Sequence, residues 1–491
     1  TKKLTVGGPM RITDGLSNVC DITVSAAAFG GLASGITQTQ KLLSGGSGLS
    51  RFGKQVKITN NGNFIIATCT YQPPNLCVYY KSGSTWYKRE DVPGAYSPQG
   101  VAISNDGEYI ASNYSQAGTI YVWKWNGSSY GTHTQVIGYD AGPSGSKMAM
   151  NTDGSKLIVG WGGYSNTSND QGLIYILTRS GTNSWATTQT LQAPVIASYG
   201  RFGASGIRMS ADGSAFTVGM PGQPSGYAFY DRTYLYRLSG SSYVLEQTFV
   251  PFTNASIGFG YDCDMNSDGT KVIVGARFYD HSGNSNSGAA YIFVKSGGSW
   301  DGGTRIEPNA PGSWATTTGD FGACVAMSDD GNRVLVGGAG SIGAIYLFDF
   351  NSGTWTQITK WQPSDVGSSD SVGSTATEDQ PLTIAGDDTF VIGVRYHNGS
   401  NGALYVGSIT SGAQAPSLNV SLPIKANGTV LSFTGQHICV PSEPMTRGLV
   451  VSANKNKYFN INGVLTTGVG AIQSSESIPM VSLSNVANDR S

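Results

Sequence analysis

The chain has 491 residues and a formal net charge of −1, and only 12% of its residues are charged, about half of the share usual in soluble proteins. Because it has no basic run, it offers nothing to a phosphate backbone, and we expect no nucleic-acid partner. No apolar stretch is long enough for a membrane helix, so we expect no membrane insertion. A composition rich in Gly, Ser, Thr and Asn is typical of a β-rich extracellular or virion-surface protein.

Residues 1–35 contain three short segments with strand composition. They are LTV, MRI and DITV, and Gly-Gly and Asp-Gly pairs separate them. Such short strands predict a small β module or an ordered arm, which we interpret as an N-terminal attachment module.

Seven copies of a β-rich unit follow. In each copy two short apolar strands are joined by a tight turn, in which Gly adopts a positive φ without strain on a Cβ. The turn glycines are Gly62, Gly107, Gly154, Gly213, Gly269 and Gly331, and the seventh copy has Asp387-Asp388 instead. A third strand such as GAAYIF (288–293) comes next, and then a fourth strand that often opens with an aromatic residue.

The spacing of the copies predicts the architecture. It varies from 45 residues between Gly62 and Gly107 to 62 residues between Gly269 and Gly331, which fits loop insertions in a propeller of four-stranded blades better than a solenoid of fixed rise. The seventh copy lacks a fourth strand, whereas residues 36–43 resemble an outer strand that has no blade. We therefore predict an all-β fold, a seven-bladed β-propeller at residues 36–414 that is closed by strand 36–43.

Two motifs recur within the copies. Four copies begin with a Phe-Gly pair, at Phe52-Gly53, Phe202-Gly203, Phe259-Gly260 and Phe321-Gly322, and the fifth continues with VIVGA (272–276) and GAAYIF. In these motifs the region from 36 to 410 resembles the FG-GAP family, the propeller repeats of integrin α chains and many extracellular proteins. The resemblance implies a repeat protein that works in adhesion. The second, third and seventh copies lack the Phe-Gly pair.

The turn at 264–272, DMNSDGTKV, starts like a calcium loop. Asp264, Asn266 and Asp268 alternate and Gly269 follows, but the ninth position, where calcium-binding FG-GAP loops carry a further carboxylate, is Val272. Since Ca²⁺ takes about six or more oxygen ligands, we expect a plain hairpin turn, no bound metal and no cofactor.

Six cysteines are spread along the chain without a CxxC motif. Cys69 and Cys77 flank neighbouring strands, so a cross-strand disulfide and a pair of free thiols both stay open. Free thiols are favoured, since cysteines beside strands often serve as small apolar residues.

Catalytic motifs are not found in the sequence. It has only four histidines, and its repeated hairpin turns carry adjacent Asp-Gly in place of the Asp-x-Gly of a sialidase box. Its carboxylates cannot be paired across a cleft from the sequence alone, as glycoside hydrolysis requires. We therefore expect that the protein is not an enzyme.

Long loops after the second strands provide candidate binding residues. Residues 161–172, 220–232 and 276–288, and the shorter 394–402, combine aromatic side chains with Asn, Asp, Arg and His. Such a mixture suits stacking on sugar faces or contact with a protein, although the aromatic residues could equally pack over the blade rim. The candidate ligand-binding residues are Tyr279, Asp280, His281, Arg395, Tyr396, His397, Trp161, Tyr164 and Tyr230.

The segment 415–491 predicts a C-terminal β module for assembly. FTGQHIC (433–439), GLVVSANKNKY (448–458) and ESIPMVSLSNVANDRS (476–491) resemble C-terminal segments of structural proteins from large DNA viruses of algae and from marine tailed phages. The resemblance implies a virion surface or fibre protein whose propeller adheres to a host glycan, a receptor or another virion protein, with homo-oligomers formed through 415–491. The alternatives are a secreted or cell-surface adhesion protein of cellular origin and a polysaccharide-degrading enzyme.

Overall fold

The computed structural model describes most of residues 35–410 and short strands outside them. The gaps are 46–50, 71–74, 96–97, 115–118, 139–145, 166–169, 222–230, 253–256, 282–284, 310–318, 339–341, 352 and 374–378. The chain divides into two compact units, residues 36–409 and the two ends together, 1–35 with 410–491. Of the described helical segments, none is long and apolar enough to cross a membrane.

The unit formed by the two ends contains short strands. β1 (Met10–Thr13) pairs with both β2 (Val19–Ile22) and β37 (Val464–Leu465), so strands from the two termini share a sheet. The other strands are β32 (Ser417–Leu418), β33 (Ile424–Ala426), β34 (Thr429–Leu431), β35 (Ile438–Cys439), β36 (Leu449–Val451), β38 (Ala471–Ser474) and β39 (Val481–Ser482).

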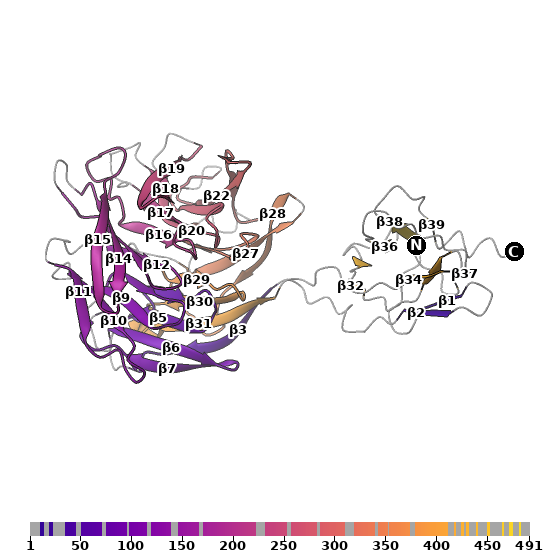
Figure 1. The fold of residues 1–491 in the computed structure, drawn as a ribbon, viewed down its shortest axis with the longest axis horizontal. Helices are drawn as coiled ribbons and strands as arrows, with labels where there is room; N and C mark the ends of the chain where they lie inside the picture. The colour runs from indigo at the N-terminus through magenta and orange to yellow at the C-terminus, as the bar shows by residue number, and fades with distance from the viewer. Residues whose placement is uncertain are drawn as a thin grey trace. The chain divides into compact units, whose positions relative to one another are not determined.

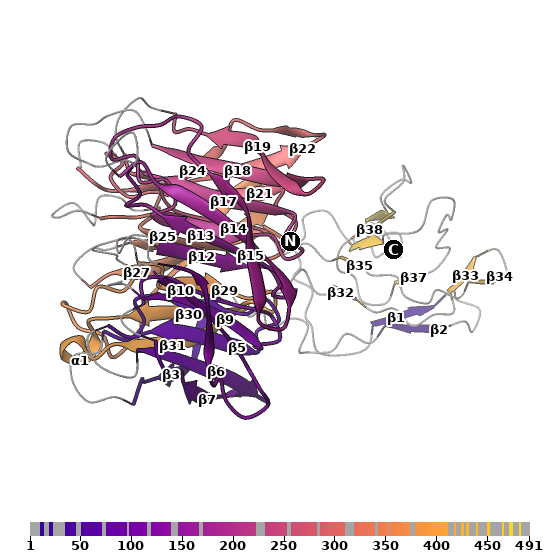
Figure 2. The same cartoon turned by 60° about the vertical axis from the view of Figure 1, so that its left-hand side comes forward.

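Residues 36–409 form seven antiparallel sheets arranged around a common axis (Figures 1 and 2), which confirms the predicted all-β, seven-bladed propeller. Blades one to three are β4 (Val56–Ile58), β5 (Phe64–Thr68), β6 (Leu76–Ser82) and β7 (Thr85–Asp91); β8 (Val101–Ile103), β9 (Tyr109–Tyr114), β10 (Thr119–Lys124) and β11 (His133–Ile137); and β12 (Ser146–Met150), β13 (Lys156–Trp161), β14 (Leu173–Gly181) and β15 (Ser184–Leu191).

The remaining blades follow the same order of strands. Blades four to six are β16 (Ser205–Met209), β17 (Ala215–Met220), β18 (Arg232–Ser239) and β19 (Ser242–Phe249); β20 (Phe259–Met265), β21 (Lys271–Ala276) and β22 (Ala289–Ser296) with β23 (Ser299–Trp300) and β24 (Thr304–Ile306) both paired to it; and β25 (Cys324–Met327), β26 (Arg333–Gly338), β27 (Ala344–Asn351) and β28 (Thr354–Trp361). Blade seven is β29 (Leu382–Ile384), β30 (Thr389–Val394), β31 (Ala403–Thr410) and β3 (Gly35–Leu42), with the helical turn α1 (His397–Ser400) before β31.

The turns between first and second strands share one local design. An Asp side chain accepts the N–H two residues later, as Asp330 Oδ1 does from Asn332 N at 2.9 Å, and the following Gly331 has a φ of 63°. In blade seven Asp388 takes this left-handed conformation with a φ of 62°, and Arg333 of blade six forms an ion pair with its carboxylate.

The Phe-Gly motif brings neighbouring blades together. A Cβ on Gly275 of β21 would overlap the carbonyl oxygen of Gly322, which starts the next blade. Only glycine permits this backbone approach, and the preceding Phe fills the space beside it. The same approach joins Gly393 to Gly53, Gly160 to Gly203, Gly219 to Gly260 and Gly337 to Gly373. The four motif phenylalanines are buried, at 0–1% exposure, and each such burial stabilises by about 1.5–3 kcal/mol.

The copies without a Phe-Gly pair fit this explanation. At the second-strand position that Gly275 occupies in blade five, blade one has Thr68 and blade two has Asn113. The copies that follow these two blades, the second and the third, lack the Phe-Gly pair. In the seventh copy Val372-Gly373 stands in the place of Phe-Gly, since Gly373 contacts Gly337.

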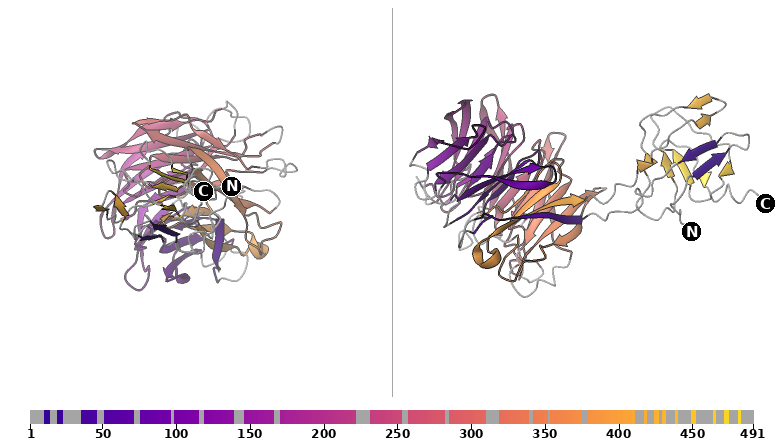
Figure 3. Two further views of the ribbon diagram at one scale, coloured as in Figure 1. Left: turned by 90° about the vertical axis from the view of Figure 1, so that its right-hand side faces the viewer. Right: turned by 90° about the horizontal axis from the view of Figure 1, so that it is seen from below.

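β3 joins the beginning of the propeller to its end. It is the fourth strand of blade seven (Figure 3, right, indigo beside orange), where the sequence predicts it. Thr39 Oγ1 donates to Val406 O at 3.1 Å. On the other side, Gln40 exchanges two hydrogen bonds of 2.9 and 2.8 Å with the backbone of Trp86 in blade one. β3 therefore connects blade seven to blade one.

We predict that Gly322→Ala lowers stability more than Gly353→Ala does. Both glycines have nearly the same φ, 89° and 88°, but a Cβ at Gly353 meets nothing within 4 Å, whereas one at Gly322 meets backbone atoms of Ala289 and Ala276. Gly353→Ala should cost about 1 kcal/mol for the positive φ alone, and Gly322→Ala several kcal/mol. Thermal unfolding of both variants measures this, and equal losses would contradict the role of the close approach.

We also predict that removal of residues 1–43 lowers the melting temperature by several degrees, at about 2–4 °C per kcal/mol in a large domain, because blade seven loses its fourth strand. Removal of residues 1–34 alone is the matched control and should leave the propeller transition in place. If both truncated proteins melt alike, β3 does not stabilise the ring.

Candidate functional site

The sequence-predicted binding residues lie on the loops that follow second strands, except Tyr230, which lies outside the described residues. Trp161 and Tyr164 are half-buried and pack edge to face, with ring centroids 4.9 Å apart. We call the face that carries these loops the long-loop face.

In blade five the predicted residues are tied to the outer strand. Arg305 of β24 lies over the Tyr279 ring, 4.7 Å from its centroid, and its Nη1 donates to the Tyr279 hydroxyl at 2.7 Å. The His281 ring contacts the carboxylate of Glu307, which also binds Arg305 Nε at 2.6 Å. These contacts hold the half-exposed Tyr279 ring in one position.

The neighbouring Asp280 closes its own loop. Its Oδ1 accepts the N–H of Asn286 at 2.7 Å, so this exposed carboxylate is partly used by the backbone.

In blade seven the predicted residues are more deeply buried. Arg395, which is 8% exposed, forms an ion pair with Asp379 and donates to the Tyr396 hydroxyl at 2.7 Å. His397 is also 8% exposed and its Nδ1 lies 2.8 Å from Asp370. This group and the blade-five group therefore each have their own partners, with blade six between them.

A second site, which the sequence reasoning missed, lies in the central channel. The first strands of the blades line this channel, and alternate residues of a strand face one side. Charged side chains from four blades meet there: Lys57, Lys147, Arg208, Asp262 and Asp264. Gln380 of blade seven donates to Asp262 at 2.9 Å, and its Oε1 accepts from Lys57 Nζ at 3.4 Å.

The two aspartates hold β20 against β25. Asp262 accepts the N–H of Val325, and Asp264 that of Met327, each at 3.0 Å. Asp264 also accepts its neighbour's N–H, Met265 N, at 2.8 Å and lies 3.3 Å from Arg208 Nε. The carboxylate expected at the start of a calcium loop is thus engaged by N–H donors, and among the described residues no group of three or more His, Cys, Asp or Glu side chains could hold a metal ion.

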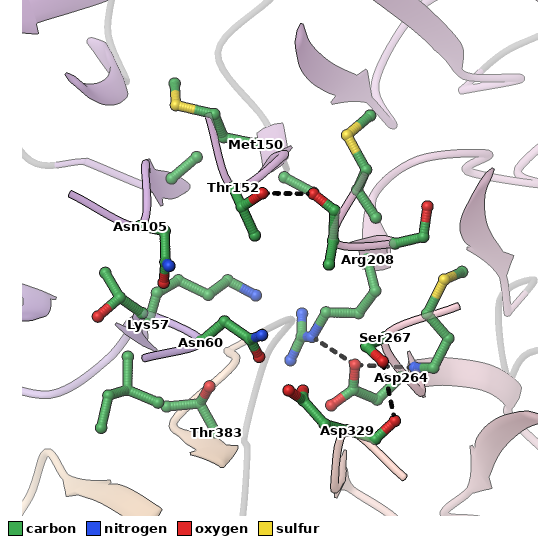
Figure 4. A pocket seen from close by; sticks show the side chains of 18 of the residues that line it. Lys57, Asn60, Asn105, Met150, Thr152, Arg208, Asp264, Ser267, Asp329 and Thr383 are labelled. Atoms are coloured by element: carbon green, nitrogen blue, oxygen red, sulfur yellow. Dashed lines mark hydrogen bonds and ion pairs between the residues drawn. The ribbon is translucent and has the colours of Figure 1, made fainter. Parts of the chain in front are cut away.

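The channel opens into a pocket of about 140 Å³, which all seven blades line. It lies where the first strands end, beside the tight turns and opposite the long-loop face. Figure 4 shows the side chains of Lys57, Arg208 and Asn60 extending toward its centre, with Asp264 and Asp329 on one side. We call it the channel-mouth pocket.

Backbone hydrogen bonds between blades surround this pocket. Thr152 N donates to Ala211 O at 3.0 Å, Ala211 N to Ser267 O at 2.9 Å, and Ser267 N to Asp329 O at 3.1 Å. Gly386 N completes the contact between blades seven and one by donating to Asn60 O at 2.8 Å. The walls of the pocket are therefore held in place without a ligand.

Burial changes the proton affinity of the channel lysines. Burial lowers the pKa of Lys147 to about 7, although Asp379 acts in the opposite direction. Burial and then the nearby Arg208 hold the pKa of Lys57 well below its ordinary value. Both shifts follow from the cost of keeping a charge away from water.

The sequence contains a signal for this site. Lys57, Lys147, Arg208, Asp262 and Asp264 interrupt strands that are otherwise apolar. Once those segments are assigned as the first strands of a propeller, charges within them predict a polar channel.

Cys69 and Cys77 do not form the cross-strand disulfide that the sequence left open. The described cysteines are all buried free thiols, as the sequence analysis favoured: Cys69, Cys77, Cys263 and Cys324.

Comparisons with known proteins address the fold. No family model matches the chain, and no curated protein matches it. Among solved structures it is similar to the β-propeller domain of Cps50 (Swd1) from Myceliophteria thermophila, with a TM-score of 0.48, 9% identity and coverage of 77% of this chain and 100% of that one. It is also similar to the WD40 repeats of RRP9, with a TM-score of 0.49, 14% identity and coverage of 77% of this chain and 100% of that one. For U3-55K the TM-score is 0.48, the identity 15%, and the coverage 76% of this chain and 99% of that one.

We predict that Lys147→Met stabilises the propeller at low pH and loses this advantage as the pH rises. The unfolded chain keeps the Lys147 proton up to about pH 10.5, whereas the folded state releases it near pH 7. Between these values the unfolded state binds more protons, so the wild-type protein gains stability with rising pH. Below pH 7 the variant should be more stable by up to a few kcal/mol.

Thermal unfolding as a function of pH, with Lys124→Met on β10 as the control, measures this difference. Parallel curves for wild type and Lys147→Met would contradict it.

Proposed function

We propose that the protein is a non-enzymatic recognition protein whose propeller binds its partner through the long-loop face. The observation that carries this proposal is the fixed, half-exposed Tyr279 ring, held by Arg305 above it and by the hydrogen bond to its hydroxyl. An aromatic ring that is already ordered loses little conformational entropy on binding. Its face can stack on a sugar or an apolar side chain.

The pair of Trp161 and Tyr164 supports the same function. It stands on the equivalent loop of blade three, with both rings half-buried. Aromatic residues with one apolar face and one polar group are enriched in protein recognition surfaces.

The environment of His397 argues against hydrolysis. A general base needs a nitrogen within reach of the proton that it abstracts, but Lys41 Nζ lies 2.7 Å from Nε2 and Asp370 2.8 Å from Nδ1. Both nitrogens are therefore in contact with charged neighbours.

A role in a virion is the finer part of the proposal. The resemblance of residues 433–439, 448–458 and 476–491 to structural proteins of algal viruses and marine phages supports a virion surface or fibre protein that adheres to a host glycan or to another capsid protein. The glycine contacts between blades give the Phe-Gly motif a physical role, which supports a relationship to FG-GAP propellers. Mass spectrometry of purified virions would distinguish this location from that of a secreted or cell-surface adhesion protein.

We predict that Tyr279→Ala and Tyr396→Ala weaken binding to host cells or to a polysaccharide array by about tenfold or more, as expected for anchor residues. Their melting temperatures should change little, since both rings lie at the surface of the loops. Tyr80→Ala is the control, because Tyr80 is 39% exposed on β6, away from these loops. Lower melting temperatures with unchanged adhesion would show that the two tyrosines only brace their loops.

A further inference from the structure

The channel-mouth pocket contains basic side chains whose hydrogen-bond donors are not fully satisfied by their protein partners. Arg208 is 8% exposed; its Nε faces Asp264, its Nη1 donates to Ile207 O at 3.1 Å, and its Nη2 is buried without a hydrogen-bond partner among the described residues. A buried donor without a partner costs about 1–3 kcal/mol. An acceptor placed in the pocket would remove this cost.

Lys57 provides a second donor at the same place. Its hydrogen bond to Gln380 is long at 3.4 Å, and its side chain extends into the pocket beside Arg208 (Figure 4). Lys147 lies deeper in the channel, where Asp379 and Lys54 act on it, and it does not line the pocket. Lys57 and Arg208 are therefore the two donors at the pocket that their protein partners do not fully satisfy.

The carboxylates of the pocket define what the anion can be. Asp264 is already satisfied by two backbone N–H groups and Arg208. Asp329 stands at the rim, where burial raises its pKa and Asn60 bonds to its side chain. Both carboxylates would repel a dianion such as phosphate more strongly than a monoanion, so a monoanion is the favoured ligand.

The size of the pocket and its uncharged polar side chains indicate which kind of anion it can bind. A volume of about 140 Å³ holds several water molecules and therefore admits a small organic acid. Asn60, Asn105 and Thr383 line the pocket together with Asp329. Amide and carboxylate oxygens of this kind accept hydrogen bonds from hydroxyl groups.

We propose that the channel-mouth pocket binds a small hydroxylated carboxylic acid of the sugar-acid class. Its carboxylate lies between Lys57 and Arg208, which can offer a forked hydrogen bond, and its hydroxyl groups face Asp329 and Asn60. The site is separate from the long-loop face and does not depend on the function proposed for that face.

Isothermal titration calorimetry of the full chain tests the assignment, with glucuronate as the probe and glucose as its neutral counterpart. Glucuronate should bind and glucose should not. Acetate should bind more weakly than glucuronate because it lacks the hydroxyl groups, and inorganic phosphate should bind more weakly because of Asp264 and Asp329. Absence of glucuronate binding, equal binding of glucose, equal binding of acetate, or tighter binding of phosphate would each overturn the assignment.

Variants locate the site. Lys57→Met keeps the length of the side chain, removes a poorly satisfied cation and should weaken glucuronate binding about tenfold or more. Lys147→Met is the matched control, since Lys147 is buried in the same channel but does not line the pocket, and it should keep binding. Tyr279→Ala should also bind glucuronate as the wild type does, which separates this site from the long-loop face. Unchanged affinity in a folded Lys57→Met protein would overturn the proposal.

Discussion

The backbone approach between neighbouring blades, at pairs of glycines, is the contact on which the propeller depends. Because no side chain separates Gly275 from Gly322, or Gly393 from Gly53, the sheets lie close enough for their first strands to surround a narrow channel. Where a larger side chain occupies the position, it makes hydrogen bonds within its own blade instead. In blade two Asn113 Oδ1 accepts the N–H groups of Gln99 and Gly100, at 2.8 and 2.9 Å.

The narrow channel forces charged groups out of water. Taking a charged pair from water costs several kcal/mol per ion, and only good geometry with further hydrogen bonds offsets this. Asp262 and Asp264 meet that condition because backbone N–H groups of blade six bind them. Lys57 and Arg208 have fewer or longer hydrogen bonds to offset the loss of water. A buried charged group that is incompletely paired indicates a candidate functional site. The long-loop face differs, since its charged groups are paired and its Arg305 and Arg395 lie over the rings of Tyr279 and Tyr396.

The fold could be predicted from the sequence because its signals are local and repeated. Turn glycines, Phe-Gly pairs and aromatic starts of the fourth strands each recur in most of the blades, and residues 36–43 matched an outer strand that was missing elsewhere. The Val372-Gly373 pair was not recognised from the sequence as the equivalent of a Phe-Gly pair, because the essential residue is the glycine and not the Phe. The partners of the loop residues could not be predicted, since Arg305 lies 26 residues from Tyr279 and on another strand. The channel pocket required charges from separate blades to be brought together, which only the closed ring does.

The closure through β3 has a consequence for synthesis of the chain. Thr39 and Val406, which are hydrogen-bonded, are separated by 367 residues. β3 is made before any blade, whereas its partner β31 is made after every other strand of the propeller. Contacts of such long range form slowly because the intervening chain must first be ordered. β3 therefore waits unpaired while the seven blades are made, and its polar pattern, with Thr37, Gln38 and Thr39 exposed, suits a segment that must stay in water without aggregating until the ring can close.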